Sequence, residues 1–159
     1  MGFSTAKIFG FTMIIFLFFG VSRWVLGQIA PKTPVITATE IRAFQNDLRG
    51  ETGFVIVDVR SKAETDVSMI PGALTKSEFE KTANQHQGKL VIAYCTIGVR
   101  SGNYADSLIR KGWKAWNYKG SILDWCANKL PLINNGQETN KVHTYSERFS
   151  APESYVGVH

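Results

Sequence analysis

Two runs of apolar residues place the strongest limit on what this chain can fold into. Phe54–Val59 is a run of mainly β-branched residues, and Leu90–Tyr94 is a second apolar run. Neither shows the apolar–polar alternation of a half-exposed strand, and such runs are typical of strands buried on both faces of a parallel sheet. Stretches with the spacing of helices lie between and after them. We therefore predict an α/β protein with a mostly parallel central sheet and helices on both faces.

The other elements are predicted from helix and turn signals around these two runs. Thr37 to Glu40 has the form of a capping box and predicts a first helix at about 39–48, which Gly50 and Gly53 end. We also expect a helical turn within 60–67, a strand that begins at 73–74, a helix at 76–83, a loop at 84–88, a helix at 101–111, a strand at 115–118 and a helix at 121–128.

A cysteine stands at the place where such a sheet carries its chemistry. Cys95 directly follows the strand Leu90–Tyr94, and residues 95–100 form a loop that leads into a helix. Open parallel sheets bind ligands beyond the carboxyl ends of their strands. Free N–H groups and the positive end of the helix dipole gather there and favour a thiolate over a thiol. The segment therefore predicts a nucleophilic cysteine beside a site for an anion.

The residues after Cys95 favour this interpretation over a purely structural cysteine. A lone cysteine behind an apolar strand is more often a small buried hydrophobic residue. Gly98, however, permits a tight turn with positive φ, and Arg100 offers planar, permanently charged donors to an oxyanion. Ser101 is expected to cap the helix that follows. The candidate anion-binding loop consists of Thr96, Ile97, Gly98, Val99, Arg100 and Ser101.

Five motifs stand in a fixed order within about 34–131. They are Val57–Arg60, Glu64, Ile70–Ala73, Cys95–Ser101 and Gly120–Trp125. Together they resemble the Asp-x-Arg signature, the frequent glutamate, the Ile-Pro-Gly-Ala turn, the active-site loop and the late Gly-Gly-x-x-x-Trp segment of the rhodanese-like domain, a family of sulfurtransferases. The resemblance implies the three-layer rhodanese-like fold for residues 35–133.

The chain departs from the pattern of that family at two positions. Met69 stands before the Ile-Pro-Gly-Ala turn, where the family often has His. Ser121 stands where the late segment often has its second Gly. Neither position is the nucleophile, so the implied chemistry is not directly affected.

The resemblance implies a two-step transfer of sulfur through Cys95, with no cofactor. The thiolate would take a sulfane sulfur from a thiosulfate-like or persulfide donor and become a persulfide. It would then pass the sulfur to a thiol or to cyanide. Backbone N–H groups of residues 96–101 would stabilise the charged persulfide. The mostly uncharged side chains of Thr96, Ile97 and Val99 do not favour a small dianion such as thiosulfate.

Two other functions remain open. The domain could be a binding module of the same fold that senses or carries persulfide, or docks an unknown protein partner, without efficient turnover. It could also be a cysteine phosphatase or an arsenate reductase. Related phosphatases have a loop one residue longer than the spacing from Cys95 to Arg100, and the shorter loop suits a single sulfur atom better than a tetrahedral group.

Two further charged groups are supporting candidates. Asp58 and Arg60 end the first buried strand, and we expect a structural ion pair there rather than direct catalysis. Arg100 is expected either to bind substrate or to hold the loop through an ion pair with Glu64 or Asp58. Cys126 is expected to pack in the core and not to form a disulfide with Cys95.

The first 27 residues form a separate segment. Ile8–Val21 carries no charge, and the apolar stretch extended to Leu26 is just long enough to span a bilayer. We expect a single-pass membrane anchor at residues 8–26, because the signal for cleavage near Gly27 is poor. A signal peptide cleaved there, with a secreted or periplasmic product, is the alternative. Residues 28–34 are expected to be a linker, and 134–159 a polar tail that either wraps the domain or stays mobile.

Composition excludes several classes of function. The 159 residues carry a net charge of +5, which is too dispersed along the chain to predict a nucleic-acid site. The two cysteines are too few for a disulfide framework, and their spacing does not predict a metal site.

Overall fold

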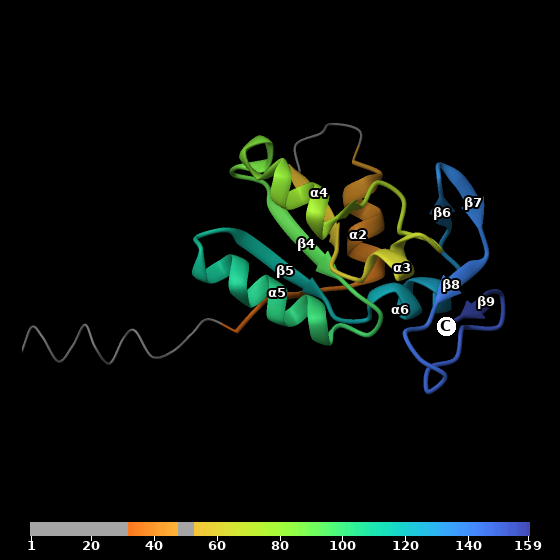
Figure 1. The fold of residues 1–159 in the computed structure, drawn as a ribbon. Coiled ribbons are helices and arrows are strands. Elements are labelled where there is room, and N and C mark those ends of the chain that lie inside the picture. The colour runs from red at the N-terminus through yellow and green to blue at the C-terminus, as the bar shows by residue number, and fades with distance from the viewer. Residues whose placement is uncertain (1–31, 48–52) are drawn as a thin grey trace, which may run out of the picture. The chain divides into compact units, whose positions relative to one another are not determined.

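The computed structural model describes residues 32–47 and 53–159 (Figure 1). In chain order the elements are β1 (Val35–Ile36), α2 (Ala38–Gln45), β2 (Phe54–Asp58), α3 (Lys62–Thr65), β3 (Leu74–Thr75), α4 (Lys76–Lys81), the 3-10 helix η1 (Ala83–His86), β4 (Leu90–Tyr94), α5 (Val99–Arg110), β5 (Lys114–Tyr118), α6 (Ser121–Ala127), β6 (Leu132–Asn134), β7 (Gln137–Thr139), β8 (Lys141–His143) and β9 (Val156–Val158).

The central sheet has five strands in the order β1-β5-β4-β2-β3, and every pairing in it is parallel. The prediction of a parallel α/β fold is therefore confirmed. The two apolar runs of the sequence became β2 and β4, which pair with each other along their full length in the middle of the sheet. All carboxyl ends lie at one edge, and Cys95 directly follows β4 at that edge.

Each face of the sheet carries its own hydrophobic core, because alternate side chains of a strand point to opposite faces. Ile56 and Ile92 belong to one cluster, together with residues of α2 and α6. Their neighbours Val57 and Val91 belong to the other cluster, which α4 and α5 cover. Both faces of β2 and β4 are thus buried, which explains why these strands lack a polar side. The helices on the two faces are visible in Figure 1.

Three helices begin with a capping box. Thr37, Ser61 and Thr75 each accept a hydrogen bond from the backbone N–H three residues on, and the glutamate at that position bonds back to the cap. These reciprocal bonds satisfy donors that a helix start otherwise leaves free. Only the first of these boxes was predicted. The helix it starts begins at Ala38 and ends at Gln45, shorter than the predicted 39–48.

The predicted start of the helix after Cys95 was wrong by two residues. The helix begins at Val99, and its N-cap is Gly98 with φ of 89°. Ser101 therefore lies inside the first turn and does not cap the helix. Ser101 was predicted as the N-cap because serine is a preferred capping residue. The observed cap, Gly98, has no side-chain oxygen by which it could be recognised. The segment 84–88 also differs from the prediction, because most of it belongs to the 3-10 helix η1.

The segment after α6 adds two small sheets to the domain. β6 and β7 form an antiparallel pair, and β8 and β9 form a parallel one. Val142 of β8 is fully buried in the same cluster as α2 and α6. Residues 134–159 thus have structure of their own, although their sequence shows no regular apolar pattern.

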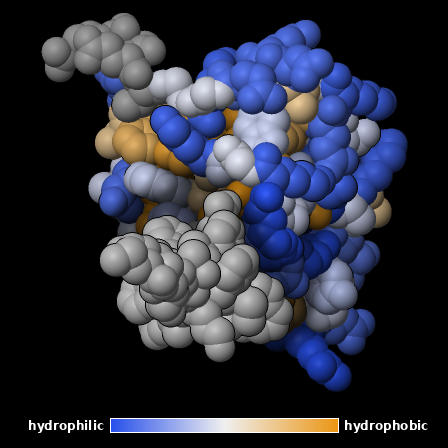
Figure 2. Space-filling model, turned by 90° about the vertical axis from the view of Figure 1, so that its left-hand side faces the viewer, coloured by the Kyte–Doolittle hydropathy of each residue, from blue (hydrophilic) through white to orange (hydrophobic). Residues whose placement is uncertain are grey.

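The surface of the domain is mainly polar on the side shown in Figure 2. Hydrophilic residues make up most of the coloured surface there, and apolar residues are visible in small areas between them. Among residues 32–47 and 53–159, no helix has the length and hydropathy needed to cross a membrane. The predicted anchor or signal segment at 1–27 and most of the predicted linker at 28–34 lie outside the described residues.

Candidate active site

Cys95 is the centre of the candidate site. It follows β4, is 1% exposed as a whole residue, and borders a pocket on the surface. Two N–H groups at the start of α6 hold the backbone where the loop begins: Ile122 donates to the carbonyl of Cys95 at 3.1 Å, and Leu123 to that of Thr96 at 3.4 Å. The strand before the cysteine and the helix beneath the loop therefore fix where the sulfur points.

Gly98 closes the loop around the sulfur. Its N–H donates to Cys95 Sγ at 3.1 Å. Its φ of 89° lies in the left-handed region, and a Cβ at this position would collide with the backbone of Lys119. Only glycine fits such a place without movement of the chain. The carbonyl of Gly98 accepts a hydrogen bond from Asn117 Nδ2 at 3.1 Å, so β5 also supports the turn.

The surroundings of Cys95 favour its ionised form. Burial alone would raise its pKa, because a charge is less stable away from water. Hydrogen bonds from the Ser101 hydroxyl and from the backbone N–H groups of Ser101, Ile97 and Gly98 outweigh burial and lower the pKa of Cys95 to about 7. At neutral pH a large share of Cys95 is therefore thiolate, without a general base beside it.

Ser101 has a role in the loop that differs from the predicted cap. Its hydroxyl is fully buried and lies 2.7 Å from Asn117 Oδ1 and 3.6 Å from Cys95 Sγ. A hydroxyl has one proton to donate, and Asn117 is the nearer acceptor. We conclude that the Ser101 hydroxyl is shared between the thiolate and Asn117, that backbone N–H groups add to the stabilisation of the thiolate, and that Ser101 also ties α5 to β5.

Ser121, one of the two positions that depart from the family pattern, also supports the cysteine. It is fully buried with φ of 57°, in the left-handed region that glycine adopts more easily. Its hydroxyl accepts a hydrogen bond from the Cys95 N–H at 3.0 Å and donates to the Tyr118 carbonyl at 2.8 Å. The serine thus keeps the backbone conformation of a glycine and adds an acceptor for the backbone N–H of Cys95.

Arg100 holds the loop through Glu64. Its two terminal nitrogens each lie 2.7 Å from a carboxylate oxygen of Glu64, and one also donates to Thr96 Oγ1 at 2.8 Å. Of the two roles considered for Arg100, the structure shows the ion pair. Burial of Glu64 opposes its charge, but the bonds from Arg100 and Ser61 lower the pKa of this carboxyl to about 2.

Asp58 and Arg60 form a buried ion pair near the site but outside its pocket. Arg60 Nη2 lies 2.7 Å from Asp58 Oδ2 and 2.6 Å from the carbonyl of Ser68, and neither charged side chain is exposed. Burial works against the charge of Arg60, and the Asp58 carboxylate more than compensates, so the pKa of Arg60 is raised. Neither residue lines the pocket at Cys95. The pair therefore joins β2 to the segment before β3.

The pocket beside Cys95 has an apolar wall that the sequence did not reveal. Its volume is about 200 Å³. Tyr145 and Phe149, from the segment between β8 and β9, line it together with the loop residues Cys95, Thr96, Ile97, Val99 and Arg100. The guanidinium of Arg100 lies over the Tyr145 ring, 4.8 Å from its centroid. No periodic pattern pointed to these two aromatic residues.

Comparison with known families now decides the class of this domain. Residues 40–128 match the sequence model of the Rhodanese-like domain. The chain belongs to that family. The match includes the loop from Cys95 to Arg100 and the Asp58–Arg60 pair, and it ends before the segment that carries Tyr145 and Phe149.

Two curated proteins are similar to this rhodanese-like chain. A protein named sulfurtransferase from Allochromatium vinosum is 30% identical over 89 residues, which cover 50% of this chain and 78% of that protein. The tRNA uridine(34) hydroxylase of Deinococcus radiodurans is 28% identical over 107 residues, or 61% of this chain. The chain spans only 35% of the length of that hydroxylase.

Solved structures show the same fold. A thiosulfate sulfurtransferase from Pseudomonas aeruginosa superposes with a TM-score of 0.55 at 24% identity, over 66% of this chain and 21% of that one. A rhodanese-like domain protein from Staphylococcus aureus gives a TM-score of 0.50 at 24% identity, over 65% of this chain and 95% of that one. At this identity the likeness establishes the rhodanese-like fold.

The second cysteine of the rhodanese-like chain is not part of the site. Cys126 on α6 is buried in the apolar cluster, and burial raises its pKa to about 12. Both cysteines are free. Within residues 32–47 and 53–159, no group of three or more His, Cys, Asp or Glu side chains is arranged to hold a metal ion.

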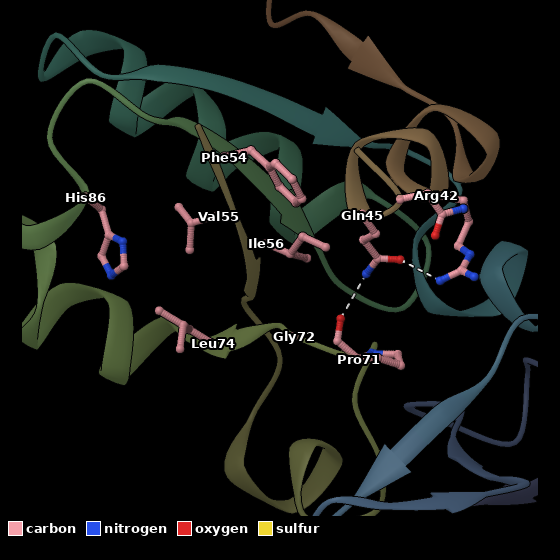
Figure 3. A pocket seen from close by; sticks show the side chains of 10 residues that line it. Arg42, Gln45, Phe54, Val55, Ile56, Pro71, Gly72, Leu74 and His86 are labelled. Atoms are coloured by element: carbon pink, nitrogen blue, oxygen red, sulfur yellow. Dashed lines mark hydrogen bonds between the residues drawn. The ribbon is translucent and has the colours of Figure 1, made fainter. Parts of the chain in front are cut away.

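A second pocket, of about 570 Å³, lies where β2 is incompletely covered (Figure 3). β3 pairs only with Val57 and Asp58, so the first residues of β2 have no strand on that side. The polar groups here bond to one another: Arg42 donates to Gln45, and Gln45 donates to the carbonyl of Pro71, as the dashed lines show. Among the described residues, those that line it include no thiol and no carboxylate, so we assign the chemistry to the pocket at Cys95.

Proposed function

We propose that this protein is a sulfurtransferase that carries a sulfane sulfur as a persulfide on Cys95. Membership of the rhodanese-like family supports the class of reaction. The observation that carries the proposal is the position of Cys95 Sγ, buried at the bottom of a loop with the Gly98 N–H 3.1 Å away. A nucleophile with a pKa of about 7 is ready to attack at neutral pH.

In the first step a bond forms between Cys95 Sγ and the outer sulfur of the donor. The bond between that sulfur and the rest of the donor breaks, and its electron pair leaves with the remainder, which is a thiolate when the donor is an organic persulfide anion. No proton moves when both partners start as anions. The N–H groups of Ile97, Gly98 and Ser101 then face the persulfide and stabilise its charge.

In the second step an acceptor attacks the outer sulfur of the persulfide. A thiolate becomes an organic persulfide, or cyanide becomes thiocyanate, and Cys95 returns as a thiolate. The leaving group is the same thiolate that the loop stabilises in the resting protein, so one set of N–H groups serves both steps. No residue beyond the loop has to deliver or remove a proton.

The test is steady-state sulfur transfer by the purified full-length protein. Thiosulfate, an organic thiosulfonate and glutathione persulfide serve as donors, and cyanide or a small thiol as acceptor. We expect transfer with at least one donor and its loss in Cys95→Ser, while Cys126→Ser remains active. The proposal fails if no donor supports transfer, or if Cys95→Ser transfers sulfur as fast as the unaltered protein.

A persulfide carrier without efficient turnover is the second candidate. It is favoured by the small volume of the pocket, about 200 Å³, in which Tyr145 and Phe149 stand beside Cys95. Such a carrier would accept sulfur on Cys95 in one stoichiometric step and release it slowly. Single-turnover loading compared with the steady-state rate separates the carrier from the enzyme.

We also propose that residues 8–26 anchor the domain to a membrane through a single span. The uncharged stretch Ile8–Val21 supports this, as does the lack of a good cleavage site near Gly27. The expected result is a full-length mass for the protein recovered from membranes and resistance to alkaline extraction. A mature protein that starts near Gln28 would instead support a signal peptide.

A further inference from the structure

The wall of the pocket at Cys95 is built by a part of the chain outside the family match. That match ends at residue 128, whereas Tyr145 and Phe149 belong to the segment between β8 and β9. These two rings therefore belong to this chain's own extension of the domain.

The segment that carries the rings is held in place. Thr144, directly before Tyr145, is fully buried, and its N–H donates to the Val158 carbonyl at 3.0 Å. Its hydroxyl lies 2.8 Å from His159 Nδ1. Tyr145 itself has φ of 72°, a conformation that a side chain of this size rarely adopts. Strained backbone of this kind persists only where the surroundings fix it, and it clusters at ligand sites.

The charges at the pocket do not suit a dianion. Arg100 is the one cationic side chain among the pocket residues, and the Glu64 carboxylate binds both of its terminal nitrogens. The Tyr145 ring covers its guanidinium. The charge that Arg100 offers to a ligand is therefore largely neutralised by Glu64, and the backbone N–H groups of the loop are the other donors next to the thiolate of Cys95.

The size and lining of the pocket suit an apolar group. Besides Tyr145 and Phe149, it is lined by Ile97 and Val99, which are 40% and 63% exposed. Side chains of this kind on a surface mark a binding site when they gather around a hollow. An apolar cavity of about 150 Å³ is enough to hold benzene. The pocket here, of about 200 Å³, has room for a group of that size.

We propose that Tyr145 and Phe149 form a specificity pocket for the apolar group of a singly charged organic sulfane-sulfur donor. The inference rests on the proposed sulfur transfer by Cys95. With an organic thiosulfonate as donor, Cys95 Sγ bonds to the terminal sulfur, and the bond between that sulfur and the sulfonyl sulfur breaks. The electron pair leaves on the sulfinate, so two anions react and two anions result. The apolar substituent of the donor rests on the two rings during this step.

The experiment compares three donors with cyanide as acceptor: benzenethiosulfonate, methanethiosulfonate and thiosulfate. The first two carry the same single charge and differ in the apolar group, and the third carries two charges. The variants are Tyr145→Ala, Phe149→Ala and the double variant in the full-length protein, all assayed in the same detergent. Tyr104→Ala is the matched control, because Tyr104 also has a cation over its ring, here Lys76, but does not line the pocket.

We expect kcat/KM for benzenethiosulfonate to exceed that for methanethiosulfonate by about tenfold, since burying a phenyl group contributes about 1.4 kcal/mol or more. Thiosulfate should be the poorest donor. The double variant should reduce this ratio to about one, because the loss falls mainly on benzenethiosulfonate, and the control Tyr104→Ala should keep the ratio of the unaltered protein. Shared detergent removes partitioning of the aromatic donor as a cause of any difference between variants.

Two results would overturn the inference about the pocket and leave the proposed sulfur transfer standing. One is turnover of thiosulfate or methanethiosulfonate as efficient as that of benzenethiosulfonate, and the other is an unchanged ratio in the double variant. Absence of Cys95-dependent transfer with all three donors, and of any sulfur adduct on Cys95, would instead overturn the proposed function and the inference with it. The two failures are therefore distinguishable in one set of assays.

Discussion

Cys95 and Cys126 show how much the surroundings decide what one type of side chain can do. Both residues are buried. Hydrogen bonds to the sulfur outweigh burial at Cys95 and bring its pKa to about 7, whereas burial among apolar side chains raises that of Cys126 to about 12. The difference lies in the donors of one short loop, and it leaves Cys95 ionisable near neutral pH while Cys126 remains a neutral thiol in the core.

The two thiols should therefore react at very different rates with an alkylating reagent. With limiting iodoacetamide, we expect Cys95 to be labelled first, at a rate that rises with pH about a midpoint near 7. The rate falls below that pH because protonation removes the thiolate. Peptide mass spectrometry assigns the label. Equal labelling of Cys126, or a midpoint for Cys95 near the ordinary value of 9.0, would contradict the description of the loop.

Gly98 and Gly112 allow a matched test of the loop geometry. Both have positive φ, 89° and 86°, but a Cβ would collide with the Lys119 backbone at Gly98 and meet open space at Gly112. Gly112→Ala should cost about 1 kcal/mol of stability and leave sulfur transfer intact. Gly98→Ala should lower transfer at least about tenfold, because the N–H that faces Cys95 Sγ must move. Similar activities of the two variants would show that the turn does not position the sulfur.

Helices and strands contribute by bringing distant residues to one edge of the sheet. β4 delivers Cys95, α5 delivers Arg100, and α3 delivers Glu64, which bonds to its own cap and to Arg100 at once. The capping box of α3 thus also anchors the loop that follows Cys95. α4 begins with the same kind of capping box, but there, among the described residues, the Glu78 carboxylate bonds only to its cap, Thr75, and not to an arginine.

Glu64→Gln and Glu78→Gln therefore separate capping from anchoring. Loss of the Glu78 charge should cost under about 1 kcal/mol, the usual value of a cap. Loss of the Glu64 charge should cost about 2 kcal/mol, because Arg100 loses both of its charged contacts. The Glu64 contribution is present above its ordinary pKa of 4.5 and is lost as the pH falls towards about 2.

Urea unfolding at neutral and acidic pH measures both effects. The difference in unfolding free energy between Glu64→Gln and the unaltered protein should narrow as the pH falls from about 5 towards 3, because Glu64 of the unfolded chain takes up a proton near 4.5 while the folded protein keeps this carboxylate ionised down to about 2. Equal unfolding free energies for the two variants at neutral pH would show that the ion pair with Arg100 does not stabilise the loop.

The elements themselves were predictable where a periodic pattern or a long apolar run decides them. β4 was predicted at its observed bounds, because Leu90–Tyr94 fits only a strand buried on both faces. The start of α5 was not, because its N-cap is Gly98 and has no side chain to signal it. Asn117 and Ser121 escaped notice as supports of the loop, since a buried polar residue shows its role only through partners distant in sequence.

At the scale of the whole domain, one part of the candidate site could not be predicted from the sequence. The motifs of the first 133 residues pointed to the family, the fold and the loop. Tyr145 and Phe149 reach the pocket because the segment between β8 and β9 packs beside Cys95. No local sequence pattern predicts that packing. Contacts between segments about 50 residues apart, as from Arg100 to Tyr145, come from packing rather than from propensity.

The central claim is that Cys95 carries sulfur, and intact-mass measurement tests it directly. After the full-length protein is mixed with a sulfane-sulfur donor and freed of excess, we expect a gain equal to one sulfur atom, located on the peptide that contains Cys95. Cyanide should remove that mass and release thiocyanate in equal amount, and Cys126→Ser should behave in the same way. A protein that gains no sulfur from any donor, or a gain that persists in Cys95→Ser, would contradict the account.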